Sequence, residues 1–167
     1  GIEFVKNASI ASIDLHDPKK GPKNWQTAAN GIFLAEYQLA TGDKSYFKDL
    51  KKCCDLLSKR VTENGTMGHH YSIPYSGGGL IIINVQAHLA WALAEKCGYS
   101  INEKSWAHSF SEVKKSLDPK TGALGYSSRA PRSPDMGART GAMATALMVA
   151  GREEKFTNSL AKSLVQL

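Results

Sequence analysis

Three stretches of the chain share a pattern that predicts helices, in which small and apolar residues are followed by a glycine. A glycine just past the last helical residue readily adopts the left-handed conformation that ends a helix. These glycines lie 56 and 53 residues apart, so we predict a repeated helical unit. The three stretches are Trp25–Thr41 before Gly42, Leu80–Cys97 before Gly98, and Gly137–Ala150 before Gly151.

A second helical pattern follows each of these glycines, over Lys44–Val61, Ile101–Leu117 and Glu153–Leu167. In these ranges apolar residues recur every three or four positions and lysines occupy the opposite faces, which is typical of amphipathic helices. The stretch Leu80–Cys97 has no polar face and is expected to be buried all round. We therefore predict an all-α fold of three helical hairpins, with an inner and an outer helix layer.

Local signals also predict where two of the outer helices begin. Asp43 is expected to cap the first of them. Ser100 and Glu103 have the spacing of a capping box, which predicts the start of the second.

The loops between hairpins repeat as well. Gly65–Gly68 and Gly122–Gly125 both read Gly-x-apolar-Gly and lie 57 residues apart. Each loop precedes an inner helix, so the loops are expected to gather at one end of the molecule. Long loops in a compact helical domain are often functional. We therefore expect a site at this loop end.

The first hairpin carries a family resemblance, because residues 31–44 read GIFLAEYQLATGDK. This segment resembles the hairpin signature of the α/α-toroid superfamily. That group includes terpene cyclases, protein prenyltransferases, lanthionine synthetase C-like proteins and several polysaccharide lyases and hydrolases. Further elements are similar to an uncharacterised bacterial family of the superfamily, and the resemblance covers residues 22–167. These elements are Gly68-His69, Ile73-Pro74, Gly77-Gly78-Gly79 and Asn84–Gly98.

A closed toroid has more hairpins than the three predicted here. The resemblance therefore implies a partial toroid, with a lead segment over residues 1–22 and an arc over residues 23–167 that is a fragment of a larger domain. A homodimer of two arcs is the alternative way to complete the ring. The resemblance also implies an exported bacterial protein, periplasmic or secreted.

Candidate catalytic residues are His69, His70 and Tyr71, which follow Gly68 just before an inner helix. Histidine and tyrosine transfer protons, and histidine also binds metals. The alternative is a loop whose histidines bond to backbone groups or face solvent.

Candidate substrate-binding residues lie in the loops or at the starts of inner helices. Arginines beside helix N-termini favour an anionic ligand, although an exposed loop kept soluble by charge is the alternative. A tryptophan in this place stacks on a sugar ring or packs against the protein. The candidates are Trp25, Tyr75, Asn84, Tyr126, Arg132, Asp135 and Arg139.

Among toroid enzymes, polysaccharide lyases match these residue types best. β-Elimination needs a histidine or tyrosine base, an acid for the leaving oxygen and a group that neutralises the carboxylate. The acidic clusters of terpene cyclases are absent from the sequence, and the loops offer few carboxylates for glycan hydrolysis. We expect a domain that binds or acts on a glycan. The alternative is a non-catalytic helical-repeat module that binds a protein or another ligand.

Composition excludes several other classes. A chain of 167 residues with 42% hydrophobic residues predicts one folded domain. The net charge of +6 is spread over helix faces, which does not favour nucleic acid. No apolar run is long enough to span a membrane. Cys53, Cys54 and Cys97 are expected to be buried free thiols, with no metal site and no cofactor.

Overall fold

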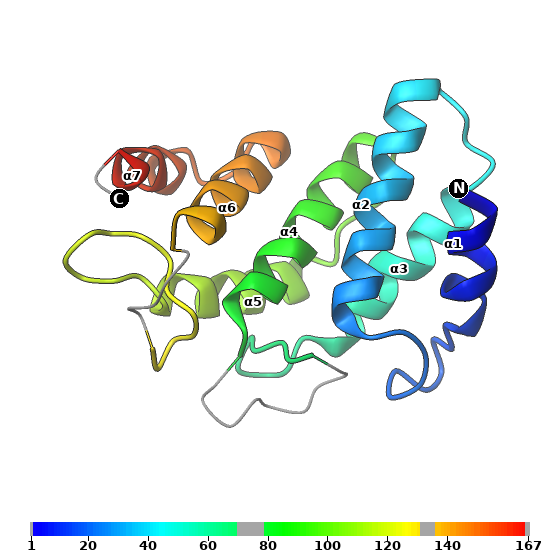
Figure 1. Ribbon diagram of the computed structural model, residues 1–167, viewed down its shortest axis with the longest axis horizontal. Coiled ribbons are helices and arrows are strands. Elements are labelled where there is room, and N and C mark those ends of the chain that lie inside the picture. The colour runs from blue at the N-terminus through cyan, green and yellow to red at the C-terminus, as the bar shows by residue number, and fades with distance from the viewer. Residues whose placement is uncertain (1, 70–78, 131–135, 166–167) are drawn as a thin grey trace.

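The computed structural model describes residues 2–69, 79–130 and 136–165, and within these ranges the chain is helical, without named strands (Figure 1). The predicted all-α class is therefore confirmed, and all six predicted helices are present with small shifts of their ends. The elements are α1 (Ile2–Ala8), the short 3-10 helix η1 (Ile10–Ser12), α2 (Asn24–Thr41), α3 (Phe47–Arg60), α4 (Ile81–Lys96), α5 (Glu103–Lys115), α6 (Met136–Ala150) and α7 (Glu154–Leu164).

Helix α4 is the centre of the molecule. It lies between α2 and α6 and also contacts α3 and α5 (Figure 1). Most of its side chains are buried, and the indole of Trp91 donates a hydrogen bond to the Cys54 carbonyl of α3 at 3.2 Å. The helices on either side bury only part of their surface. Phe33 of α2 is 42% exposed, and Met148 of α6 is 71% exposed. The middle inner helix is thus the most deeply buried of the three, although Ile82, Gln86 and Leu89 on one face are only half-buried, so the expected burial all round is confirmed in part.

Helices α3, α5 and α7 are amphipathic, and each buries one apolar face. They pair with α2, α4 and α6 respectively, as the order of the chain predicts. Cys53 and Cys54 on α3 are buried free thiols, as predicted, whereas Cys97 is free but only half-buried. Burial raises the pKa of Cys53 to about 12, so this thiol stays protonated and unreactive near neutral pH.

This fold requires glycine at two kinds of position: at helix ends with positive φ, and where a loop backbone lies directly against a helix. Gly42, Gly98 and Gly151 follow the inner helices with φ of 73°, 97° and 67°, which confirms the predicted left-handed helix ends. Gly65 has φ 80°, and a Cβ there would lie 1.9 Å from the His108 carbonyl oxygen. This glycine therefore lets the first loop lie directly against α5.

The lead segment covers the flank of the first hairpin. Ile10 is fully buried, and the side chain of Asn30 on α2 donates to the hydroxyl of Ser9 at 2.8 Å. From α3, the guanidinium of Arg60 donates to the carbonyls of Pro18, Lys20 and Pro22 at 2.6–2.8 Å. These bonds join residues 18–22 to the body of the molecule.

Candidate functional site

The two repeated loops bond to the starts of the inner helices in the same way. The backbone N–H of Asn24, at the start of α2, donates to the His69 carbonyl at 3.0 Å. The N–H of Ile81, at the start of α4, donates to the Tyr126 carbonyl at 3.0 Å. Donors and acceptors are both shifted by 57 residues. His69 and Tyr126 therefore occupy equivalent places at the beginnings of neighbouring helices.

Each loop also bonds to the inner helix that follows it. Met67 and Leu124, the apolar residues of the two Gly-x-apolar-Gly cores, are both buried. The N–H of Leu80 donates to the Met67 carbonyl at 2.8 Å, and the N–H of Leu124 donates to the Thr140 hydroxyl at 2.9 Å. The first loop thus joins the starts of α2 and α4, and the second joins those of α4 and α6. The described parts of both loops lie at one end of the inner helices.

An aromatic pair lies at the start of α2. The indole Nε1–H of Trp25 donates to Nδ1 of His69 at 2.7 Å, so the two rings meet edge to edge, with their planes 28° apart and their centroids 5.9 Å apart. Trp25 is half-buried and His69 is exposed. The side chain of Asn24 donates to the Gly68 carbonyl at 2.7 Å and holds the loop in this position.

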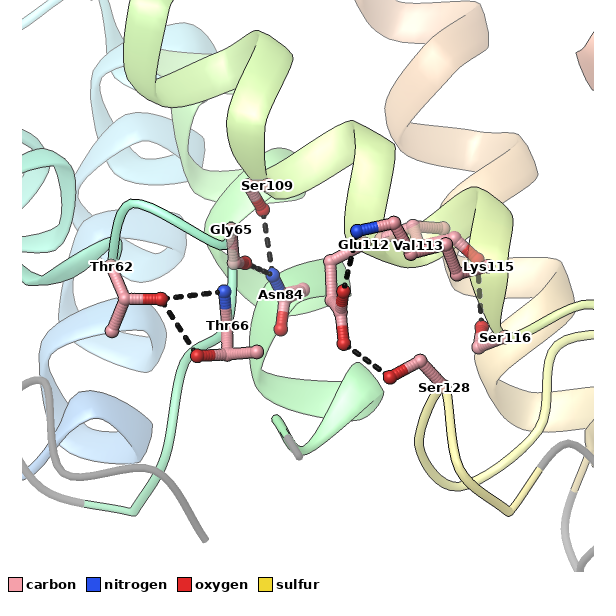
Figure 2. A network of polar contacts seen from close by, with 10 residues as sticks. All are labelled: Thr62, Gly65, Thr66, Asn84, Ser109, Glu112, Val113, Lys115, Ser116 and Ser128. Carbon is pink, nitrogen blue, oxygen red and sulfur yellow. Dashed lines mark hydrogen bonds and ion pairs between the residues drawn. The ribbon is translucent and has the colours of Figure 1, made fainter. Parts of the chain in front are cut away.

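Asn84 lies inside the molecule rather than on a binding surface. It is fully buried, and its amide nitrogen donates to the Gly65 carbonyl at 2.7 Å and to the Ser109 hydroxyl at 2.8 Å (Figure 2). Its Oδ1 atom has no hydrogen-bond partner among the described residues. The observed bonds join the first loop and α5 to the start of α4, which is a structural role.

Glu112 of α5 is a second buried polar residue of this region (Figure 2), and it was not among the predicted site residues. Its carboxylate is almost fully buried, accepts a hydrogen bond from the Ser128 hydroxyl, and lies 3.5 Å from Nζ of Lys115 (Figure 2). One feature of the sequence indicates that Glu112 is buried: this acidic residue directly precedes Val113, which is itself buried. The carboxylate attaches the second loop to α5.

The second loop presents one of its predicted residues at the surface. The side chain of Tyr126 is 37% exposed. Arg139 is buried, and its Nε atom donates to the Leu124 carbonyl at 3.4 Å. The buried carboxylate of Asp118 accepts from the backbone and the hydroxyl of Thr121. These bonds of Arg139 and Asp118 stabilise the loop that carries Tyr126.

The remaining predicted site residues lie outside the described residues. Within the described part of the chain, no group of three histidine, cysteine, aspartate or glutamate side chains is arranged to hold a metal ion. No helix there combines the length and the apolarity needed to cross a membrane. The predicted residues without a description are His70, Tyr71, Tyr75, Arg132 and Asp135.

His88 of α4 is a residue of the core. Its ring is fully buried and meets Trp91, Trp106 and Phe110 edge-on, with the Trp106 centroid 4.2 Å away. Neither ring nitrogen has a hydrogen-bond partner among the described residues. Burial, with a smaller contribution from the charge of Arg152, lowers the pKa of His88 to about 3. The imidazole is therefore neutral near pH 7.

Comparison with known proteins places the chain in one family. Residues 2–165 match the family described as "Domain of unknown function (DUF6288)". The match spans nearly the whole sequence, so the chain belongs to this family. No curated protein and no solved structure matches it.

Proposed function

We propose that this chain is an arc of an α/α toroid whose loop end binds a glycan, in an exported bacterial protein. Two observations support the toroid part. Successive inner helices lie side by side, each paired with an outer helix. Successive loops bond to the inner helices with one 57-residue period, as repeated hairpins in an arc require.

The observation that carries the glycan part is the Trp25–His69 pair. An aromatic ring packs against the apolar face of a sugar, and the polar edges of histidine and tyrosine bond to hydroxyl groups. The bond from Trp25 to His69 holds both rings in place before any ligand arrives, which lowers the entropic cost of binding. Tyr126, in the equivalent place one repeat later, extends this surface toward α4.

Binding is supported better than hydrolysis. Glycoside hydrolysis needs two carboxylates at the scissile bond. The buried carboxylates of Glu112 and Asp118 instead bond to Ser128 and Thr121 within the loop scaffold. The lyase hypothesis, with His69 as a base, is tested in the experiment that tests binding.

A titration of the protein with neutral and acidic polysaccharides tests the proposal, with calorimetry and tryptophan fluorescence as readouts. We expect Trp25→Ala and Tyr126→Ala each to weaken binding about tenfold, which corresponds to about 1.4 kcal/mol. Phe4→Ala is the control, because Phe4 is an exposed aromatic residue of the lead segment. Absence of binding across the panel would overturn the proposal. Formation of unsaturated, ultraviolet-absorbing product would establish a lyase.

One observation favours the protein-binding module as the second candidate function. A groove of about 520 Å³ lies between α6 and α7 and is lined by Leu147, Met148 and Ala161, among others. Its exposed methionine is typical of surfaces that pack against a partner.

A further inference from the structure

The turns after α4 and α6 each bond back to the hairpin before them. The residue after the glycine that ends α4 is Tyr99, whose hydroxyl donates to the Asp55 carboxylate of α3 at 2.9 Å. The residue after the glycine that ends α6 is Arg152, whose guanidinium donates to the Glu103 carboxylate of α5 at 2.7 and 2.8 Å. A hydrogen-bond donor directly after the glycine therefore joins each of these hairpins to the preceding outer helix.

Three side chains of the second hairpin hold Arg152. Glu103 is the first residue of α5, and Trp106 is the fourth, with its ring centroid 4.7 Å from the guanidinium carbon of Arg152. Glu95 of α4 stands three residues before the glycine and accepts from Arg152 at 3.0 Å. The end of an inner helix and the start of its outer helix together thus form a binding site for the turn of the next hairpin.

The groove between α6 and α7 has the same three positions in the third hairpin. Glu154 is the first residue of α7, Thr157 is the fourth, and Met148 stands three residues before the glycine that ends α6. All three residues line the groove. Glu154 is exposed, and its carboxylate has no ion-pair or hydrogen-bond partner among the described residues. The groove therefore corresponds to the place that Arg152 occupies one hairpin earlier.

We propose that this groove binds a further helical hairpin, whose inner helix ends with a glycine followed by tyrosine or arginine, and that this residue donates to Glu154. The inference rests on the arc of the proposed function and is independent of the glycan site. It also states the chemistry of the partner for the protein-binding module.

The groove lining determines this chemistry. Its single carboxylate, Glu154, accepts a hydrogen bond from a tyrosine hydroxyl or an arginine, as Asp55 does from Tyr99. Met148 is flexible and polarisable, so it packs against an aromatic ring or against the aliphatic part of an arginine. The apolar lining favours burial against a helix with small and apolar residues.

A second copy of this chain meets the groove through apolar contact alone. Its Tyr99 and Arg152 are already bonded within their own molecule. The turn of its first hairpin reads Gly42-Asp43, and a carboxylate is unable to donate to Glu154. A hairpin with a donor after the glycine is therefore the better partner and is expected to displace a second copy.

A synthetic peptide of residues 136–153, which comprises α6 and its turn with Arg152, is the probe. Its binding to the full chain is measured by fluorescence anisotropy of a dye at the peptide N-terminus, in low-salt buffer. We expect the parent peptide and its Arg152→Tyr variant to bind. The Arg152→Glu peptide is expected to bind about fivefold more weakly, as the upper value for an exposed ion pair implies. In the Glu154→Lys chain we expect the reverse order, with Arg152→Glu as the tighter peptide.

Glu36→Lys, at an exposed position of α2, makes the same change in net charge and is the matched control. We expect it to leave the order of the peptides unchanged. Binding of none of the peptides, or the same effect of Glu36→Lys and Glu154→Lys, would overturn the proposal. Self-association that the peptide does not displace in sedimentation velocity would assign the groove to a second copy instead. Glycan binding at Trp25 is measured separately, so its outcome is distinguishable from each of these.

Discussion

At the scale of single residues, the buried guanidinium of Arg60 holds the lead segment against the first helical pair. Arg60 is 1% exposed and bonds to three carbonyls of residues 18–22. Arg60→Leu would leave these carbonyls without a donor, so we expect the free energy of unfolding in urea to fall by about 3 kcal/mol. Lys48→Leu, at an exposed position of the same helix, is the matched control. Equal stability of the two variants would contradict the role of Arg60.

A second prediction concerns His88 and the pH dependence of the free energy of unfolding. Its pKa is about 3 in the folded protein, against 6.5 for an unperturbed histidine, so between these values the unfolded chain binds more protons. Stability contributed by neutral His88 is therefore present above pH 6.5 and is lost as the pH falls toward 3. From pH 7 to pH 5 we expect a loss of about 2 kcal/mol from this residue.

Urea unfolding at the two pH values measures this loss. His88→Leu removes the titrating group, so its stability is expected to depend less on pH than that of the parent protein. His108→Leu, on α5, is the control and is expected to keep the parental dependence. The same pH dependence in His88→Leu as in the parent would refute the assignment.

At the scale of helical elements, the start of α5 differs from the predicted capping box. The cap is Asn102, whose side-chain oxygen accepts from the backbone N–H of Ser105 at 3.0 Å, and not Ser100. Glu103 instead bonds to Arg152, at 2.7 and 2.8 Å. Asn102→Ala is expected to lower the melting temperature, in line with a loss of about 1 kcal/mol. Ser100→Ala is expected to have no such effect, and a reversed order would contradict this cap.

The start of α3 shows the same kind of difference. The predicted cap, Asp43, bonds to the N–H of Ser45 in the preceding turn at 2.8 Å, and the helix begins only at Phe47. Capping residues occur near both helix starts, but several candidates lie within a few positions of each other. Local sequence therefore places a helix start only to within a few residues.

At the scale of the whole molecule, the two flanks of the helical array differ. The lead segment covers the flank of α2 and α3, while the groove between α6 and α7 is open, with Met148 71% exposed. We expect the chain to associate with a second copy through this groove, because burial of its apolar lining is favourable. Sedimentation velocity over a wide concentration range measures this association.

A charged residue in the groove tests where the association occurs. Met148→Lys is expected to shift the equilibrium to the monomer, whereas Phe4→Lys, in the lead segment, is expected to leave it unchanged. A parent protein that stays monomeric at all concentrations would exclude the homodimer. Association that Met148→Lys does not weaken would place the interface elsewhere.

The helices, their glycine ends and the buried middle helix were all predictable from the amino-acid sequence. Helical periodicity and a left-handed glycine after the last turn depend on neighbouring residues, so Gly42, Gly98 and Gly151 are informative by themselves. The position of each loop directly before an inner helix also predicted that the loops gather at one end. Which hairpins complete a ring stays a proposal.

Only the tertiary structure decided what the polar residues of the loop end do. Asn84 and Glu112 prove to be buried parts of the scaffold, whereas Trp25 meets His69 at the surface. The partners of Trp25 and Asn24 lie 44 residues away along the chain, and the bond from Arg60 to Asn24 spans 36. Sequence periodicity reports which face of a helix is buried. The pairing of one polar atom with another depends on how distant segments pack, because a hydrogen bond needs its two atoms within about 3 Å.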